Sequence, residues 1–93
     1  MMNYLHEDFS LNSGDDVVVT LDSQANVRLL DDVNYGRYQR GEQHSYFGGL
    51  VRVSPVRIPA PQSGHWHVVI DLGGYAGTIR ASVVVEKEAL QHA

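Results

Sequence analysis

Cysteine is absent from this chain of 93 residues. Its absence excludes disulfide bonds, thiolate metal sites and cysteine nucleophiles. Long apolar runs are absent as well, and no stretch approaches the roughly 20 apolar residues of a membrane-spanning helix. The opening residues lack both the basic region and the apolar stretch of a secretory signal. We therefore expect a cytoplasmic protein that does not enter a membrane.

Basic residues are in the minority. Lys and Arg number 7 against 11 Asp and Glu, which gives a formal net charge of −4. General binding to duplex nucleic acid needs a broad basic face, so we do not expect that role. A chain of this length has room for one compact core but not for a deep enclosed active site. The sequence thus predicts a single β-rich domain over residues 1–93, with residues 86–93 as a frayed or helical tail.

Alternation of apolar and polar residues with period two dominates the chain and predicts β-strands. About six short strands are expected, near residues 5–11, 17–21, 26–29, 50–58, 65–72 and 78–85. Pro55 interrupts the fourth, which we therefore expect at a sheet edge or at a bulge. One short helical turn is predicted at 32–40, where an aspartate can cap it. This pattern is typical of an all-β fold, either a small antiparallel sandwich or a partly open barrel.

Short breaks between neighbouring strands predict two hairpins, and the apolar face of one strand predicts a main core residue. The strands at 16–21 and 26–29 are separated by a short polar break and are expected to pair. The strands at 65–72 and 78–85 flank a glycine-rich loop and are also expected to pair. The single tryptophan, Trp66, falls on the apolar face of its strand and is expected to be buried there as a main stability anchor.

Four segments carry a resemblance to a known family: ANVRLLD at 25–31, YFGG at 46–49, SPVR at 54–57 and SGHWHVVIDLGG at 63–74. With these segments the chain resembles the bacterial family catalogued as domain of unknown function 1883, from Leu5 to about Val85. The resemblance implies a compact β-rich domain and no particular activity. Relatives of this kind can sit beside a TIR-type signalling domain, which by association implies a sensing or partner-binding role.

Two histidines form the first candidate site. His65 and His67 are two residues apart on a predicted strand, so both imidazoles project from one face. Neutral imidazole is a good zinc ligand, but a usable site needs a third ligand. Asp71 lies about 13 Å along the strand, too far away, whereas the fold could bring His6 or His44 close. The alternative is that both histidines are solvent-side neighbours of the buried Trp66, and we assign no metal ligand from the sequence.

Four aspartates form the second candidate: Asp15, Asp16, Asp31 and Asp32. In the first predicted hairpin they would gather at its open end. Carboxylates are ligands for Ca²⁺, but this ion needs six or more oxygens. The favoured interpretation is therefore turn and cap chemistry, in which each aspartate binds nearby backbone N–H groups.

The third candidate is the segment 34–49, which is long for a connection in so small a domain. It is locally basic in an acidic protein and contains Arg37, Arg40, His44 and Tyr46. Arginine offers a planar fork for phosphate or carboxylate, and tyrosine offers a stacking face. We therefore predict that these four residues engage an anionic or aromatic ligand. In the competing account the tyrosines cover one end of the core and the arginines pair with acidic neighbours.

Motifs for catalysis are missing. The sequence has no serine nucleophile motif, P-loop or dinucleotide fingerprint, so we expect no enzymatic activity and no cofactor. The favoured function is a non-enzymatic binding or protein-interaction module with a small anionic ligand or a protein partner. Two other classes stay open. One is a small metal-binding protein or metal-dependent enzyme built on His65 and His67, and the other is a module that self-associates through the edge strand containing Pro55.

Overall fold

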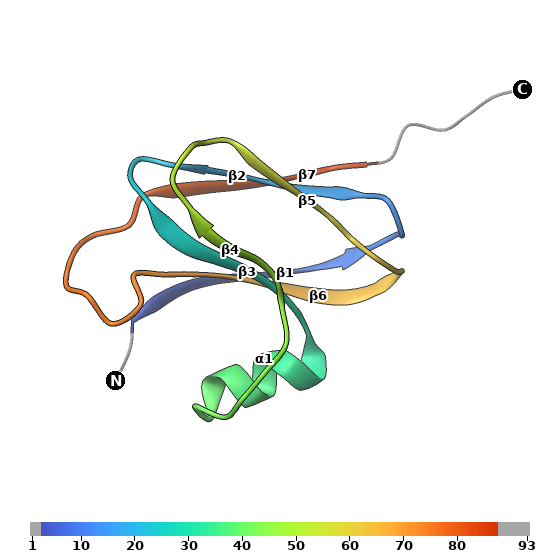
Figure 1. The fold of residues 1–93 in the computed structure, drawn as a ribbon. Helices are drawn as coiled ribbons and strands as arrows, with labels where there is room; N and C mark the ends of the chain where they lie inside the picture. The colour runs from blue at the N-terminus through green and yellow to red at the C-terminus, as the bar shows by residue number, and fades with distance from the viewer. Residues whose placement is uncertain (1–2, 88–93) are drawn as a thin grey trace, which may run out of the picture.

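Two antiparallel sheets lie face to face, and one short helix packs outside them (Figure 1). The computed structural model describes residues 3–87. Its elements in chain order are β1 (Tyr4–Leu11), β2 (Asp16–Leu21), β3 (Ala25–Asp31), α1 (Asp32–Gln39), β4 (Phe47–Val51), β5 (Val56–Pro59), β6 (Gly64–Asp71) and β7 (Ala81–Glu86). One sheet has the order β1-β6-β3-β4 and the other the order β5-β2-β7. The predicted small all-β sandwich with one short helix is therefore confirmed.

The core lies between the two sheets and follows the alternation in the sequence. Val17 and Val19 of β2 and Val27 and Leu29 of β3 are all 0% exposed. Trp66 of β6 is 4% exposed, as predicted, and its Nε1–H donates to the carbonyl of Gln62 at 3.0 Å. Inward residues of both sheets thus form one apolar layer, as expected for a sandwich.

Both predicted hairpins are wrong. β2 pairs with β5 and β7, whereas β3 pairs with β4 and β6 in the other sheet. Likewise β6 lies between β1 and β3, and β7 pairs with β2. The connections 22–24 and 72–80 therefore cross from one sheet to the other instead of closing a hairpin. Alternation could not reveal this, because it fixes which side chains face the core but not which strand lies alongside.

The strand predicted around Pro55 is two strands. β4 ends at Val51 and β5 begins at Val56, and Pro55 lies in the connection between them. Each of the two is an edge strand, in a different sheet, so the predicted edge position is confirmed. Of the predicted tail at 86–93, only Glu86, the end of β7, and Lys87 fall within the described residues.

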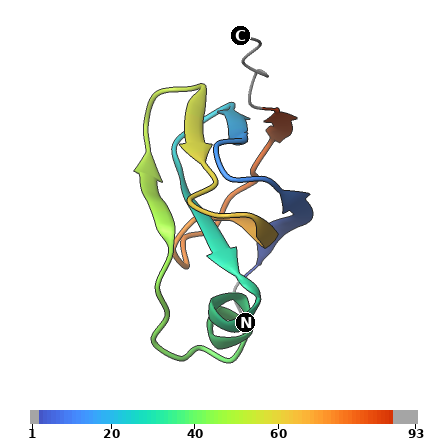
Figure 2. The same ribbon diagram turned by 90° about the vertical axis from the view of Figure 1, so that its right-hand side faces the viewer.

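Helix α1 packs on the outer face of the four-stranded sheet, on the side away from the three-stranded sheet (Figure 1). Its N-cap is Asp31, whose side chain accepts a hydrogen bond from the backbone N–H of Asn34 at 2.8 Å. Tyr38 of the helix packs with Leu30 and Val69 of the sheet in a small buried cluster that is separate from the main core. A long connection then returns along the side of the sheet to β4 (Figure 2). Within residues 3–87, the structure contains no helix with the length and apolar character to cross a membrane.

Candidate functional site

Most of the side chains that could carry chemistry lie on the outer face of the four-stranded sheet. Core-facing residues of β6 alternate with outward residues, so His65, His67 and Asp71 all point to that face. The strand register places outward residues of the neighbouring strands beside them: Tyr4, His6 and Asp8 from β1, and Asn26 and Arg28 from β3. Two clusters result, one at the first turn of α1 and the other at its last turn.

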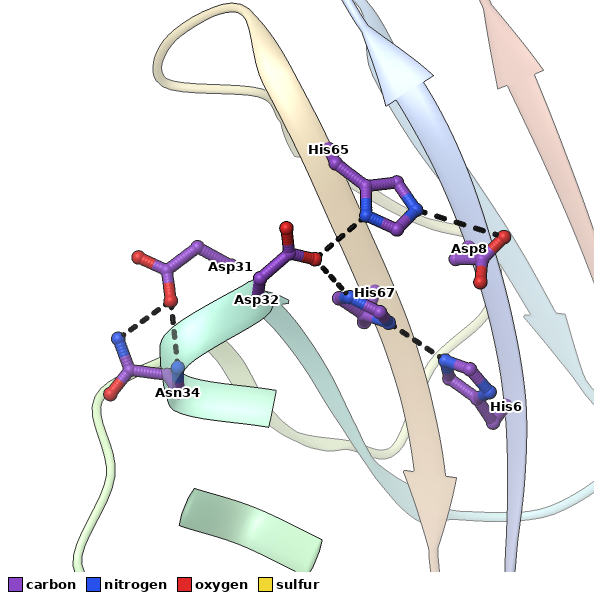
Figure 3. A network of polar contacts seen from close by, with 7 residues as sticks. All are labelled: His6, Asp8, Asp31, Asp32, Asn34, His65 and His67. Atoms are coloured by element: carbon purple, nitrogen blue, oxygen red, sulfur yellow. Dashed lines mark hydrogen bonds and ion pairs between the residues drawn. The ribbon is translucent and has the colours of Figure 1, made fainter. Parts of the chain in front are cut away.

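The first group, which we call the histidine cluster, consists of His6, Asp8, Asp32, His65 and His67 (Figure 3). Asp32 is the first residue of α1, and its Oδ1 lies 2.7 Å from Nδ1 of His65 and 2.6 Å from Nε2 of His67. A carboxylate oxygen can only accept, so both ring nitrogens donate to it. The hydrogen bond from His67, followed by that from His65, lowers the pKa of the Asp32 carboxyl. Asp32 and His65 are exposed, whereas His67 is buried.

His67 is also held from the side of β1. Its Nδ1 lies 2.9 Å from Nε2 of His6. The ring of Tyr35, from α1, stacks on both, with centroids 4.2 Å from His67 and 4.3 Å from His6. Burial lowers the pKa of His6, and the neighbouring His67 lowers it further. Asp8 completes the cluster, since its Oδ1 lies 3.9 Å from Nε2 of His65. The rings are therefore fixed in orientation by stacking and by polar partners on both sides.

The prediction that His65 and His67 share one face is confirmed. The fold also brings His6 to them, whereas His44 lies in the other cluster. The interpretation of both histidines as solvent-side neighbours is right for His65 and wrong for His67, which α1 covers. Asp32 was not expected here. An aspartate at the start of a helix that follows directly after a strand is the signal that could have indicated it.

The second group, which we call the arginine–tyrosine cluster, consists of Arg28, Tyr38, His44, Tyr46 and Asp71. Cζ of Arg28 lies 5.1 Å from the ring centroid of Tyr46 and 5.5 Å from that of Tyr38, within the range of cation–π contacts. The ring of His44 packs against both tyrosines, at centroid distances of 5.3 Å from Tyr38 and 5.7 Å from Tyr46. The cluster joins the loop after α1 to the outer face of the sheet.

Asp71 is the buried anchor of this cluster, with 0% exposure. It pairs with Arg28, and it accepts hydrogen bonds from the Tyr38 hydroxyl at 2.8 Å, the Asn26 side chain at 2.9 Å and the Gly73 backbone N–H at 2.8 Å. Burial alone would raise the pKa of this carboxyl, but these donors and the Arg28 charge hold it below the ordinary value. Asp71 is therefore ionised and fully engaged at neutral pH.

The four ligand-binding residues predicted from the sequence belong to one structured segment. His44 and Tyr46 are in contact, and Tyr46 is 42% exposed. Arg37 is exposed in the last turn of α1, and Arg40 pairs with the exposed Glu42. Arg28 was missed, although the alternation of β3 already predicted that it points outward.

The four aspartates do not gather. Asp15 and Asp16 lie at the start of β2 in one sheet, whereas Asp31 ends β3 of the other sheet and Asp32 begins α1. Asp15 accepts a hydrogen bond from the backbone N–H of Asn12 at 2.8 Å, and Asp31 caps α1. Turn and cap chemistry is thus confirmed for these two, while Asp16 lies 3.7 Å from Arg57 and Asp32 belongs to the histidine cluster.

Comparison with known proteins adds one finding. A family model matches residues 2–89, nearly the whole chain. No curated protein and no solved structure matches the chain. Because the matched residues include both sheets, α1 and all members of the two clusters, the resemblance noted in the sequence is confirmed, and the chain belongs to the family described as Domain of unknown function (DUF1883).

Proposed function

We propose that this chain is a non-enzymatic, cytoplasmic binding module that recognises an anionic or aromatic ligand or partner through Arg37, Arg40, His44 and Tyr46. The observation that carries the proposal is the pair between Arg40 and Glu42. Nε of Arg40 lies 3.0 Å from Oε2 of Glu42, and Nη2 lies 3.2 Å from Oε1. The guanidinium thus holds a carboxylate in the two-point geometry that suits a ligand carboxylate or phosphate. Both side chains are more than half exposed, at 59% and 53%, so an external anion can replace Glu42.

The segment is ordered before any ligand arrives. The backbone N–H of Glu42 donates to the carbonyl of Arg37 at 2.9 Å, and that of Gly41 donates to the carbonyl of Tyr38 at 3.1 Å. The backbone N–H of Ser45 donates to the Asn34 side chain at 2.9 Å, which ties the end of the loop to α1. Ordering a loop on binding opposes affinity, so a loop that is already closed favours recognition.

Charge and aromatic character support the same ligand class. Residues 34–46 contain two arginines and one glutamate, in a chain whose net charge is −4. A local excess of positive charge on an acidic protein steers anions to this surface. The exposed Tyr46, with Arg28 below its ring and His44 beside it, offers a stacking platform for a flat ligand.

Nuclear magnetic resonance titrations of the ¹⁵N-labelled protein test the proposal, with inorganic phosphate, adenosine monophosphate and a glutamate-rich peptide as probes. We expect shifts of amides 36–46 with at least one probe. Arg40→Gln should weaken that binding roughly tenfold, the value of a charge-assisted hydrogen bond. Glu42→Gln should strengthen it about two- to fivefold, because it removes the competing carboxylate.

The matched control is Arg57→Gln. Arg57 holds Glu86 in a similar exposed pair on the three-stranded sheet, away from the loop. The Arg57→Gln variant should bind the probe with unchanged affinity. Added salt should weaken binding of the probe to the wild-type protein. Absence of shifts with every probe would overturn the proposal, as would equal effects of Arg40→Gln and Arg57→Gln.

A further inference from the structure

The histidine cluster has a feature that helix attachment alone does not require: ligand atoms of Asp32, His65 and His67 all lie within 4.8 Å of one another. Oδ1 of Asp32, Nδ1 of His65 and Nε2 of His67 form a set in which one oxygen lies 2.7 and 2.6 Å from the two nitrogens. Nitrogen and carboxylate oxygen ligands in this number are those that protein zinc sites use. One hydrogen bond from either histidine to Asp32 would be enough to attach α1 to the sheet. The presence of both histidines at the same oxygen therefore indicates a further role.

The distances fit a metal site with a small outward movement of Asp32. Two ligands of a tetrahedral zinc ion, each bound at about 2.0–2.1 Å, are about 3.3 Å apart. The Asp32 oxygen would therefore move away from the rings by about 0.6–0.7 Å. Asp32 is able to do this because its side chain is 64% exposed and lies at the beginning of the helix. Nδ1 of His65 and Nε2 of His67 already face one and the same oxygen atom, so the rings can keep their orientation.

Each histidine also has a polar group near its other ring nitrogen, at hydrogen-bond distance for His67 and at ion-pair distance for His65. Zinc-bound histidines donate the second N–H to a carboxylate, a carbonyl or another acceptor, which fixes the ring and its tautomer. Nδ1 of His67 faces Nε2 of His6 at 2.9 Å, and Nε2 of His65 faces the Asp8 carboxylate at 3.9 Å. His6 therefore already fixes His67 on the side away from Asp32, and Asp8 lies near enough to accept from His65 after a small movement of its exposed side chain.

The hydrogen-bond network allows proton positions that are compatible with reversible metal binding. Without a metal, His65 and His67 each direct an N–H at Asp32, and Nδ1 of His67 accepts from His6. When the two nitrogens bind a metal, the His65 proton resides on Nε2 and the His67 proton on Nδ1. His67 then donates to Nε2 of His6, whose own proton moves to Nδ1. The number of protons on the three rings does not change, so the hydrogen-bonded chain is kept with its direction reversed.

We propose that Asp32, His65 and His67 bind a divalent transition metal, with Zn²⁺ the best match. Zinc suits two imidazoles and one carboxylate, and three protein ligands leave a fourth position for water or a ligand atom. His6 is a positioning residue that orients His67. The chain offers a second combination, His6, Asp8 and His67, but it would use the other nitrogen of His67. We assign the ion to the Asp32 side because the contacts there are shorter and both nitrogens face one oxygen.

Zinc titration of the untagged protein, by calorimetry and by metal analysis after dialysis, tests the assignment. We expect one zinc ion per chain. Asp32→Asn and His65→Gln change exposed side chains, so the sandwich should stay folded. Each should lower the affinity more than about 100-fold, beyond the loss for an outer hydrogen-bond partner. His6→Gln should lower it about 10–100-fold with unchanged stoichiometry, and cobalt should still give the visible spectrum of a tetrahedral site.

Two control variants decide between sites. His44→Gln removes a histidine of the other cluster and should leave zinc binding unchanged. Asp8→Asn should keep the stoichiometry of one, whereas loss of zinc with Asp8→Asn but not with Asp32→Asn would assign the ion to the other combination and overturn the proposal. It would also be overturned if wild type bound no zinc at concentrations of about 100 µM, too weak for a site with three convergent ligands. Circular dichroism on every variant separates loss of a ligand from loss of the fold.

Discussion

Asp71→Asn tests whether the buried network on the outer face stabilises the fold. The change keeps the shape of the side chain but removes the charge that Arg28 pairs with. Both carboxylate oxygens of Asp71 accept hydrogen bonds, whereas an asparagine side chain accepts only through its oxygen and donates through its NH₂ group. The side chain of Arg28 is 17% exposed, so its charge would be left mostly buried without its partner.

The expected loss of unfolding free energy follows from the burial of the Arg28 side chain. Removing one partner of a buried ion pair costs about 3–5 kcal/mol. Water reaches part of Arg28, so we expect about 3 kcal/mol, near the lower limit. A domain of this size has a free energy of unfolding of about 5–14 kcal/mol, so the variant should fold with a clearly reduced stability. With a urea m-value of about 1 kcal/mol/M, the midpoint should fall by about 3 M.

The assay is urea unfolding followed by the fluorescence of Trp66, the only tryptophan in the chain. Arg28→Met and the double variant complete a double-mutant cycle, in which the double variant should cost less than the sum of the single ones. Glu86→Gln, which breaks the exposed pair with Arg57, is the control and should leave the midpoint nearly unchanged. An Asp71→Asn midpoint within 0.3 M of wild type, about a tenth of the expected shift, would refute the assignment of a stabilising role to this network.

Three further results are expected. Trp66→Ala should cost about 3–5 kcal/mol, because the ring is 4% exposed; an unchanged melting temperature would contradict this. Gly48 has φ +116° and a Cβ there would collide with the Val27 carbonyl, so Gly48→Ala should cost more than Gly49→Ala, whose Cβ meets nothing within 4 Å. Because folding lowers the pKa of Asp71, its contribution is present above about pH 4 and disappears as the pH falls through the folded pKa. The difference in stability between wild type and Asp71→Asn should therefore shrink in acid, and a constant difference from pH 7 to 2 would argue against it.

The strands could be predicted from the sequence because alternation is a local property. Val17 and Val19 face the core whichever strand lies beside β2, and the same holds for Val27 and Leu29. The pairing of strands could not be predicted on that basis. The three residues 22–24 connect two sheets as readily as they close a hairpin, and the difference depends on contacts between distant segments such as β2 with β7.

The candidate sites, like the strand pairing, could be predicted only where they depend on neighbouring residues in the sequence. The spacing of His65 and His67 placed both on one face, since that depends only on the strand. Asp32 joins them because α1 folds back over β6, and the register of β1 brings His6 opposite Val69, next to His67. The sequence can indicate that Asp32 begins a helix directly after a strand, but the contacts of Asp32 and His6 with His67 depend on tertiary structure. Sequence reasoning therefore identified His65 and His67 and offered His6 as one of two possible partners, and it needed the structure for Asp8 and Asp32.

Helix α1 contributes Asp32 to one cluster and Tyr38 to the other. It is attached through a small apolar patch that is separate from the main core. Such an element can detach as a unit while the sheets stay paired, and its amide protons would then exchange well before those of the strands. Each detachment dismantles both clusters at once. We therefore expect an occupant of either cluster to hold the helix in place for the other, which would couple the two ends of α1 through one local unfolding equilibrium without any contact between their ligands.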